Sequence, residues 1–241
     1  MASGSSPQSL PFALSPIGKK LLTGMTGLGL VLFVLGHLVG NLTLFFSTNA
    51  YNQLGQLIES LGPLTGAVEL LLLGAVMFHA ALGLQIFIDK VRARSDRYAA
   101  YQSKGQPTGQ SGPASAAAPS YQSLSSRSMI WTGLVLAVFL VWHLATFKFG
   151  PHYLVPDTEI RDLSRLVVEK FSQPAYVGGY GAVMVLLGVH LRHGLWSALQ
   201  SLGLLNQRLR PFVYGTGTVL AILIATGFLG LPVAIYFDWL G

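Results

Sequence analysis

The sequence predicts an all-α integral membrane protein built as a bundle of five transmembrane helices. Only 10% of its 241 residues are charged and 51% are hydrophobic, whereas a soluble domain carries about 25% charged residues. Five windows contain no Asp, Glu, Lys or Arg, namely residues 21–58, 70–88, 128–147, 171–191 and 211–237. A helix crosses the bilayer with about 20 predominantly apolar residues. Five such windows exclude a soluble globular protein and leave no room for a large soluble catalytic domain.

Within these windows we expect membrane-spanning helices over residues 21–46, 64–88, 128–149, 175–200 and 211–237, which together form one membrane domain. Proline stands at or just before the start of three of them, at Pro63, Pro174 and Pro211. The missing N–H of proline costs nothing in the first turn of a helix. Pro232 lies inside the last span and should kink it near its end.

Three segments lie outside the predicted spans. Residues 1–20 form a polar, Pro- and Ser-rich N-terminal segment, and residues 95–126 are expected to be a flexible cytoplasmic linker. Residues 150–174 form an outer loop, in which residues 157–171 are expected to be a short amphipathic helix. The apolar face of that helix consists of Ile160, Leu163, Leu166 and Val167. No strong internal repeat is evident.

Lys and Arg gather on one side of the predicted bundle. Ten of them lie in the N-terminal segment and in the loops after the second and fourth spans: Lys19, Lys20, Lys90, Arg92, Arg94, Arg97, Lys104, Arg127, Arg208 and Arg210. Since the excess of Lys and Arg marks cytoplasmic loops, we expect the N-terminus in the cytoplasm and the C-terminus outside. The formal net charge of +6 then reflects topology and contact with membrane lipid, and we expect no nucleic-acid partner.

The histidines are the candidate functional residues. The chain has no cysteine, which excludes disulfides, iron–sulfur ligation, thiolate zinc sites and covalent c-type haem attachment. A redox metal would therefore be held by His, Met or carboxylate. Ionisable residues are costly in a membrane and usually face the bundle interior. Five of the six histidines fall within predicted spans, namely His37, His79, His143, His190 and His193.

The direction of each span places four of these histidines at two depths. His37 and His143 lie on outward-running spans, each about 4 residues, or ~6 Å, past the midpoint toward the outside. His79 and His190 lie on inward-running spans, each roughly 3 residues past the midpoint toward the inside. The two levels are separated by about 7 residues, or on the order of 10 Å.

Two histidines at equal depth on different helices can ligate one haem iron from both faces, and bundle interiors build cofactor sites in this way. We therefore expect two haem b groups, an outer one held by His37 and His143 and an inner one held by His79 and His190. Ligation by two histidines fills both axial positions and favours electron transfer over oxygen binding. Small residues near the ligands would admit flat porphyrins, or serve ordinary helix packing: Gly36, Gly40, Gly83 and Gly194.

Other polar residues near the inner level are candidates for accessory roles. His193 competes with His190 as the ligand, but it lies deeper toward the cytoplasm and matches His79 less well. Arg192, His193 and Arg127 are candidates for contacts with the haem propionates. Arginines at helix ends also extend toward the membrane surface without any ligand, and this alternative stays open.

Two polar residues near the outer level are also candidates. Asn41 follows His37 by four residues and so lies on the same helix face, where it can bond a propionate or a quinone, or pair with another helix. Glu69 lies near the outer end of the second span. It can relay protons to a quinone near the outer haem, or it can simply reach the outer interface.

Several segments resemble the diheme cytochrome b membrane-anchor subunit of succinate dehydrogenase/fumarate reductase, in its single-subunit, five-helix form. They are GHLVGNLTLF (36–45), AYN (50–52), ELLLLGAVMFHA (69–80), SRSMIWTGLVLAVFLVWHL (126–144) and VHLRHGLWSALQSLG (189–203). The resemblance covers roughly residues 17–237 and departs mainly at 95–125. It implies that His190 is the ligand of its segment, and it implies the same histidine pairing.

This resemblance also implies the partners and the role of the chain. Flavoprotein and iron–sulfur subunits would sit on the cytoplasmic face, and electrons would pass between them and membrane quinone, either menaquinone or ubiquinone, through the two haems. The chain would not touch succinate and has no catalytic residue for it. We expect a multi-pass protein of the cytoplasmic (inner) membrane of a prokaryote. The alternatives are a diheme cytochrome b of a hydrogenase or formate dehydrogenase type, and a haem-free membrane anchor.

Overall fold

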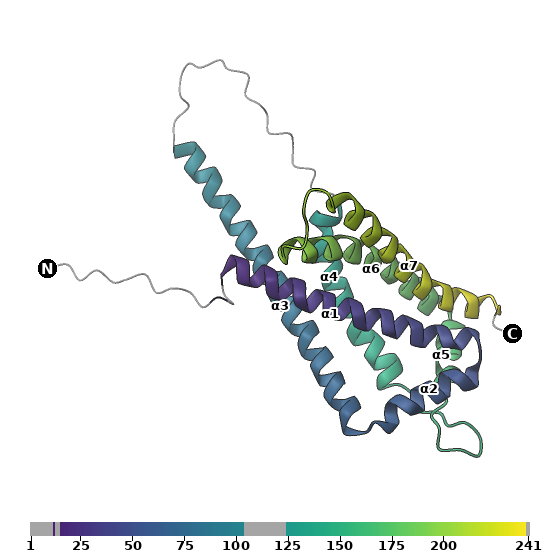
Figure 1. Ribbon diagram of the computed structural model, residues 1–241. Helices are drawn as coiled ribbons and strands as arrows, with labels where there is room; N and C mark the ends of the chain where they lie inside the picture. Colours follow the sequence, from purple (N-terminus) through teal and green to yellow (C-terminus); the bar gives the residue numbers. More distant parts are fainter. Residues whose placement is uncertain (1–11, 13–14, 104–123, 240–241) are drawn as a thin grey trace.

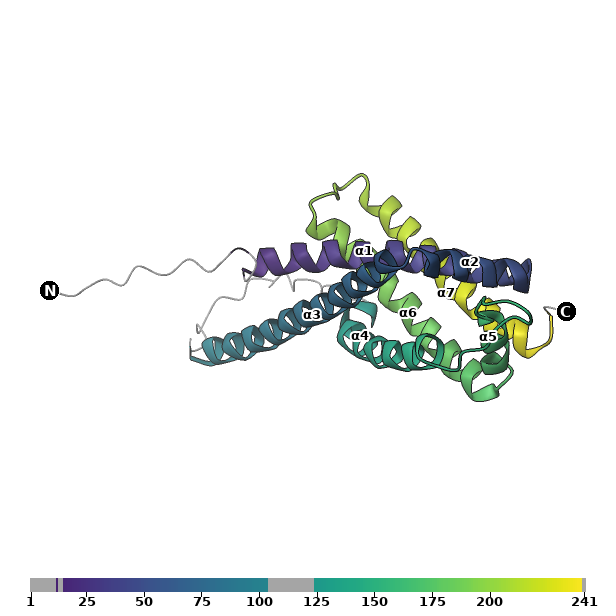
Figure 2. The same ribbon diagram turned by 90° about the horizontal axis from the view of Figure 1, so that it is seen from below.

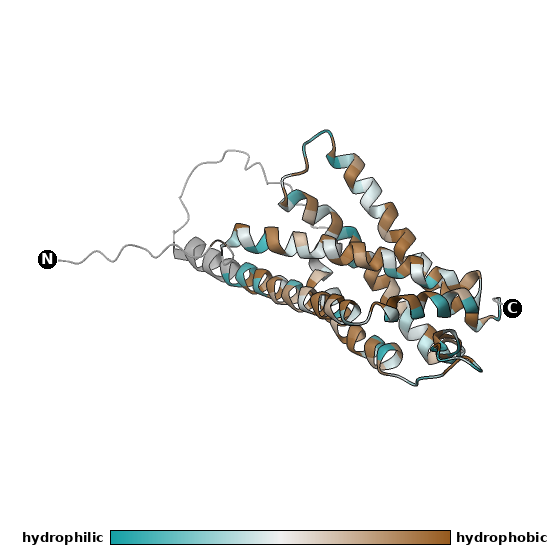
Figure 3. Cartoon of the chain, turned by 60° about the horizontal axis from the view of Figure 1, so that its bottom comes forward, coloured by the Kyte–Doolittle hydropathy of each residue, from teal (hydrophilic) through white to brown (hydrophobic). Residues whose placement is uncertain are grey.

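The computed structural model describes residue 12 and residues 15–103 and 124–239, with the backbone only for residues 93–103 and 124–127. Across these residues the chain is helical and forms no β-strand beyond an isolated bridge between Leu154 and Arg161. Five helices are long and apolar enough to cross a membrane, over Pro16–Phe45, Pro63–Arg92, Ser128–Lys148, Pro174–Ser201 and Arg210–Tyr236. The predicted all-α fold with five spans is thus confirmed, and Figure 3 shows hydrophobic residues along the length of each span.

The helices in chain order are α1 (Pro16–Leu42), η2 (Thr43–Phe45), α2 (Thr48–Ser60), α3 (Pro63–Ser103), α4 (Leu124–His143), η3 (Leu144–Lys148), α5 (Leu163–Phe171), α6 (Pro174–Ser201) and α7 (Arg210–Tyr236). Four of them surround a common interior: α1 packs against α3 and α6, and α4 packs against the same two helices. Consequently α1 and α4 stand at opposite corners of the bundle, as do α3 and α6. Helix α7 packs outside this group against α6 and α1 (Figure 1).

The first helix starts earlier than expected. Ser15 caps α1, and its hydroxyl accepts a hydrogen bond from the Gly18 N–H, so the helix begins at Pro16 and includes two lysines that were assigned to the N-terminal segment. Serine caps and a proline in the first turn both stabilise a helix start. One of these lysines, Lys19, forms an ion pair with Asp89 of α3 at 2.7 Å. The basic ends of α1 and α3 therefore lie together.

Helix α3 is longer than the sequence suggested. The predicted linker began at residue 95, but α3 continues through Ser103, and α4 begins at Leu124. Residues 92–103 contain neither Gly nor Pro, so nothing in them interrupts a helix. The rest of the predicted linker, residues 104–123, lies outside the described residues. The end of α3 projects beyond the neighbouring helices (Figures 1 and 2).

Two short helices close the other end of the bundle. Helix α2 was not expected from the sequence; Ser47 caps it through hydrogen bonds to two backbone N–H groups. The amphipathic helix expected from residue 157 begins only at Leu163, because Asp157 adopts a left-handed backbone conformation and Asp162 serves as the cap. Leu166 and Val167 of α5 are buried as its apolar face predicted.

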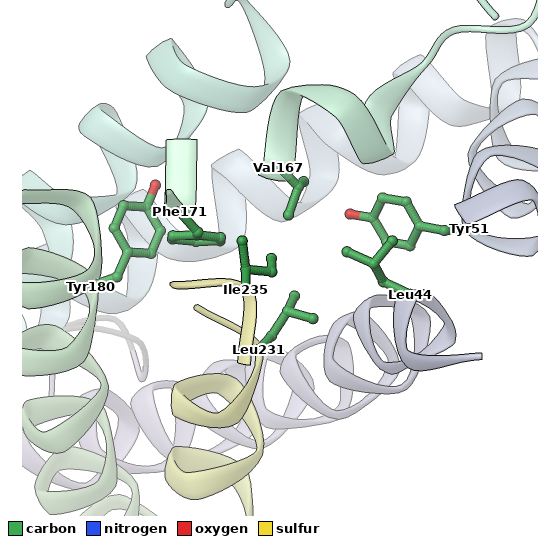
Figure 4. Close-up of a cluster of buried hydrophobic side chains, with 7 residues drawn as sticks. All are labelled: Leu44, Tyr51, Val167, Phe171, Tyr180, Leu231 and Ile235. Carbon is green, nitrogen blue, oxygen red and sulfur yellow. The ribbon is translucent and has the colours of Figure 1, made fainter. Parts of the chain in front are cut away.

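These two helices pack onto the bundle through a hydrophobic cluster. Figure 4 shows its seven buried side chains pointing toward one another from η2, α2, α5, α6 and α7. They are Leu44, Tyr51, Val167, Phe171, Tyr180, Leu231 and Ile235. A hydrophobic side chain contributes about 1.5–3 kcal/mol when it is fully buried. The cluster therefore joins the outer loops to the spans, and the apolar face of the amphipathic helix is part of the core.

Asp162 ties α2 to α5. Its Oδ1 accepts hydrogen bonds from the Asn52 side chain at 2.9 Å, the Ser164 hydroxyl at 2.7 Å and the Arg165 N–H at 3.0 Å. Partial burial raises the pKa of this carboxyl, but the three hydrogen bonds outweigh burial and hold the pKa below its usual value.

Asp162→Ala should lower the stability of the outer loops by about 1–2 kcal/mol, as the loss of a helix cap does. Since the folded pKa is lowered, the contribution of Asp162 is complete above the unfolded pKa, near 3.8, and is lost as pH falls through the folded value. Limited proteolysis of the outer loops should therefore accelerate in the variant at pH 7. Glu159→Ala, on the exposed part of the same loop, is the matched control and should cleave like the wild type.

Candidate functional site

The bundle interior brings the four span histidines together in two pairs. The rings of His37 on α1 and His143 on α4 lie 5.7 Å apart between their centres, at 88°. The rings of His79 on α3 and His190 on α6 lie 6.4 Å apart, at 65°. Each pair joins helices at opposite corners of the bundle, so the two rings meet across its interior.

The separations within the pairs suit one metal between two rings. A histidine nitrogen binds a transition metal at about 2 Å, so two nitrogens on opposite sides of one metal lie about 4 Å apart and their ring centres about 6 Å apart. Both observed separations lie close to this value. Within the part of the chain that the structure describes, no group of three or more His, Cys, Asp or Glu is placed to hold a metal. A donor set of two imidazoles fits a haem, whose porphyrin supplies the other four nitrogens.

The inner pair has its second ring nitrogens engaged. The Nδ1 atom of His79 lies 3.2 Å from the carbonyl oxygen of Thr23 and 3.3 Å from the hydroxyl of Thr26. The Nδ1 atom of His190 lies 3.1 Å from the hydroxyl of Thr132. Hydrogen bonds of this kind fix the tautomer and orientation of a ligating ring. They leave both Nε2 atoms available for a metal.

Two of these threonines, Thr26 and Thr132, belong to an internal repeat that was not predicted from the sequence. TGLGLVLFVLGHL in α1 (26–38) parallels TGLVLAVFLVWHL in α4 (132–144). In both segments a Thr-Gly pair faces a histidine of the next span: a Cβ atom on Gly27 would stand 3.1 Å from His79, and one on Gly133 would stand 3.5 Å from His190. Helices α3 and α6 share the shorter pattern His-x-x-x-Gly-Leu.

This repeat explains why the histidines pair at equal levels. In both α1 and α4 the outer histidine follows the glycine at the inner level by ten residues, a rise of about 15 Å. The separation of the levels is therefore larger than the 10 Å expected from span midpoints. The early start of α1 moves the midpoint of this span away from His37 and accounts for part of the difference.

Aromatic rings enclose the outer pair. His143 lies among Phe139, Phe147 and Tyr180, with ring centres 5.4–6.2 Å away. The Tyr180 hydroxyl lies 3.5 Å from its Nδ1 atom. Immediately after His143 the chain forms the π-helical turn η3, closed by a hydrogen bond from the Phe149 N–H to the Leu144 carbonyl at 2.9 Å. Such turns are frequent at functional sites, and here the turn sets the direction in which the chain leaves the outer pair.

Asn41 connects the outer pair to the short helix α2. Its Nδ2 donates to the His37 carbonyl at 2.7 Å and lies 3.4 Å from the His37 Nε2, while its Oδ1 accepts from the Tyr51 hydroxyl at 3.3 Å. Burial raises the pKa of Tyr51 to about 12, although the nearby charge of Arg161 opposes the shift. Tyr51 therefore stays a neutral hydrogen-bond donor at physiological pH.

Arg161 is the functional candidate that the sequence did not suggest. It donates to the Phe147 carbonyl at 2.8 Å, lies 4.0 Å from the Glu59 carboxylate, and keeps a buried Nε without a hydrogen-bond partner. An unpaired buried donor of a charged group is costly. Its neighbours Phe147 and Tyr51 both adjoin the outer pair, so the unpaired donor suits an anionic group there, such as a haem propionate.

The remaining sequence candidates are placed differently. Arg192 stands about 200° round α6 from His190 and donates a hydrogen bond to Tyr214 of α7, so the structure directs it away from the inner pair. His193 packs beside Trp196, with ring centres 6.2 Å apart. Arg127 lies in the first turn of α4, and its side chain is outside the described residues.

Glu69 forms an ion pair with Lys148 at 2.5 Å. The two side chains are about half exposed and join the outer ends of α3 and α4.

The four glycines near the histidines have different surroundings. Gly36, Gly83 and Gly194 face open space, where an added Cβ would meet no atom within 4 Å, while Gly40 lies near Leu54. The open positions leave room beside the histidine pairs.

Comparison with known protein families finds a match to part of the chain. The family model described as succinate dehydrogenase/fumarate reductase transmembrane subunit matches residues 21–105. That range contains His37 and His79, with the spans that carry them, while His143 and His190 lie beyond it. No match was found among curated proteins or among solved structures. The chain is a multi-pass integral membrane protein, and residues 21–105, which carry most of its first two membrane spans, are similar to the succinate dehydrogenase/fumarate reductase transmembrane-subunit family.

Proposed function

We propose that this chain is the electron-carrying membrane anchor of a succinate:quinone oxidoreductase and holds two haem b groups, one in each histidine pair. The observation that carries the proposal is the arrangement of two histidine pairs at two levels, each across the bundle and each with rings about 6 Å apart. Haem b supplies reversible one-electron transfer at a bound iron. The chain itself would hold, orient and shield the two groups.

Each element of the bundle has a part in this proposal. His79 and His190 would bind the inner haem through Nε2, since their Nδ1 atoms are engaged with α1 and α4. His37 and His143 would bind the outer haem, and Arg161 would neutralise a propionate there. The hydrophobic cluster that includes residues of α2 and α5 packs at the outer end of the bundle and would keep bulk water from the outer pair.

The two levels define a path across the membrane. We propose that the flavoprotein and iron–sulfur subunits dock at the basic ends of the spans, on the cytoplasmic face of a prokaryotic inner membrane. Electrons would then pass between them and quinone by way of the inner and outer pairs. Asn41, held between His37 and Tyr51, and the Glu69 carboxylate at the outer surface are the polar groups proposed to serve the quinone and its protons.

The haem content of the purified complex tests this function. We expect two b-type haems for each copy of the chain, together with co-purified flavoprotein and iron–sulfur subunits. A complex without haem would mean that the chain serves only as a membrane anchor, and it would overturn the proposed electron path. Two haems with hydrogenase or formate dehydrogenase subunits would instead assign the chain to another quinone-linked enzyme.

Thr132→Val should change the inner haem without affecting the outer one. The Thr132 hydroxyl donates to the Ser128 carbonyl and so accepts from the His190 ring. Loss of this acceptor makes the imidazole a weaker electron donor, so the midpoint potential of the inner haem should rise, and haem affinity should fall about tenfold. Redox titration of the reduced absorbance band measures the first effect. Thr216→Val, on the far side of the bundle, is the control and should leave both potentials unchanged.

A further inference from the structure

The ends of α6 and α7 that adjoin their connecting loop carry two arginine–aromatic contacts that cross between the helices. The Arg192 guanidinium of α6 lies 5.1 Å from the ring centre of Tyr214 on α7 and donates a hydrogen bond to its hydroxyl. The Arg210 guanidinium of α7 lies 5.6 Å from the ring centre of Trp196 on α6. We call these four residues the arginine–aromatic square.

The square follows from the sequence spacing. Arg192 and Trp196 are four residues apart on α6, and Arg210 and Tyr214 are four residues apart on α7, so each pair lies on one helix face. The two helices run in opposite directions, joined by the loop 202–209, which sets each arginine against the aromatic ring of the other helix. Trp and Tyr concentrate at the membrane–water interface. The Trp196–Arg210 contact therefore lies toward the membrane–water interface, and the Arg192–Tyr214 contact lies about 6 Å deeper along the two helices.

The positive charge of this corner has no acidic counterpart nearby in the sequence. No Asp or Glu occurs between Glu169 and Asp238, an interval that contains both helices and their loop. Arg208 adds a further positive charge in the loop. Among residues 15–92 and 128–239, none of the ion pairs includes Arg192 or Arg210. The aromatic rings stabilise the two guanidinium groups but do not neutralise them, so the corner favours an anion from outside the chain.

An apolar groove begins beside the square and runs toward the middle of the membrane. It has a volume of about 430 Å³ and follows α7 from Pro211, the residue after Arg210, to Leu223. This length of helix rises about 18 Å. Gly215, which follows Tyr214, leaves the groove open, because an added Cβ there would meet no atom within 4 Å. Thr216 is the one lining residue with a polar side chain, and its hydroxyl donates to the Phe212 carbonyl, so the groove matches a hydrocarbon chain better than a polar ligand.

We propose that this corner of α6 and α7 binds an anionic phospholipid from the leaflet on the arginine-rich side. The phosphate would lie at the arginine–aromatic square, and one acyl chain would follow the groove of α7. Basic pockets between transmembrane helices on the cytoplasmic side recognise acidic head groups in this way. An acidic surface of a protein partner would neutralise the arginines of this corner, but it would leave the groove on α7 empty. The proposal does not depend on the haems.

Titration of the intact complex with two lipids tests the proposal. Dioleoyl phosphatidylglycerol and dioleoyl phosphatidylcholine would be added in turn to delipidated complex, and the lipids retained for each copy of the chain would be counted by native mass spectrometry. We expect one phosphatidylglycerol to bind at concentrations where phosphatidylcholine does not. Arg210→Gln should weaken phosphatidylglycerol about fivefold, which corresponds to the loss of one basic residue at a membrane surface, and should leave phosphatidylcholine unchanged.

Two further variants separate this site from general surface charge. Arg208→Gln removes the same charge from the loop outside the square and should change phosphatidylglycerol binding less than twofold. Gly215→Phe fills the groove and should weaken the retention of phosphatidylglycerol while all arginines remain. Equal losses from Arg208→Gln and Arg210→Gln would overturn the proposal, as would equal affinity for both lipids. Binding that appears only after the soluble subunits are removed would also overturn it, since a protein would then cover the corner.

Discussion

Replacing His190 with Ala should remove the inner haem and leave the outer one. The reason is geometric: His79 and His190 face each other 6.4 Å apart between ring centres, whereas the outer pair is formed by two other helices. The haem content should fall from two to one for each copy of the chain. His79→Ala should likewise leave a complex with only the outer haem, and its absorbance spectrum should match that of His190→Ala. His143→Ala should lose the other haem and so leave a different spectrum.

The test distinguishes loss of a ligand from general misfolding. His193→Ala is the matched control, because its ring lies three residues away on the same helix beside Trp196 and is not a member of either pair. It should keep both haems. Should His193→Ala lose the inner haem while His190→Ala keeps it, the assignment of the inner ligand would be wrong.

Gly150→Ala should disrupt the chain just beyond the outer pair. A Cβ atom on Gly150 would stand 1.9 Å from the carbonyl oxygen of Thr146. This oxygen belongs to the backbone of η3, so no side-chain rotation can relieve the overlap, and η3 itself would have to rearrange. We expect a loss of stability of about 3 kcal/mol or more, together with loss of the outer haem, since η3 follows His143 directly.

Thermal unfolding of the purified complex and its haem spectrum measure the two effects. Gly178→Ala is the control, because an added Cβ there meets no atom within 4 Å and alanine favours the helix. It should be at least as stable as the wild type and keep both haems. An unchanged melting temperature in Gly150→Ala would contradict the geometry of the π-helical turn.

The spans could be predicted from the sequence because lipid imposes a strict rule on every one of them. Charged side chains are excluded over about 20 residues of each span. A stretch without charged residues can be seen in the sequence without any knowledge of how the helices pack. The short helices α2 and α5 lie outside the membrane and obey no such rule. Helix α2 was therefore not predicted. The start of α5 was predicted too early, because the left-handed conformation of Asp157 and the cap at Asp162 delay the helix.

The histidine pairs were predicted from depth alone, since span direction and residue number determine depth. Depth does not tell which neighbouring helix a side chain faces, so contacts that depend on the orientation of a helix about its own axis could not be predicted. Arg192 lies near His190 in sequence but points to α7, and Arg161 is distant in sequence yet lies near Phe147 and Tyr51. The repeat of Thr-Gly with a histidine ten residues later was present in the sequence. Its two copies differ at most positions between the glycine and the histidine, and the contacts of Gly27 with His79 and of Gly133 with His190 depend on the packing of the helices.

Paired substitutions of the four histidines test the central claim most directly, with haem counted in the purified complex. The double variant His79→Ala/His190→Ala empties one pair, so one haem should remain for each copy of the chain. The double variant His37→Ala/His79→Ala breaks both pairs, so no haem bound by two histidines should remain. The number of histidines removed is the same in the two variants. Equal haem content in both, or a retained haem with two histidine ligands in the second, would contradict the two paired sites.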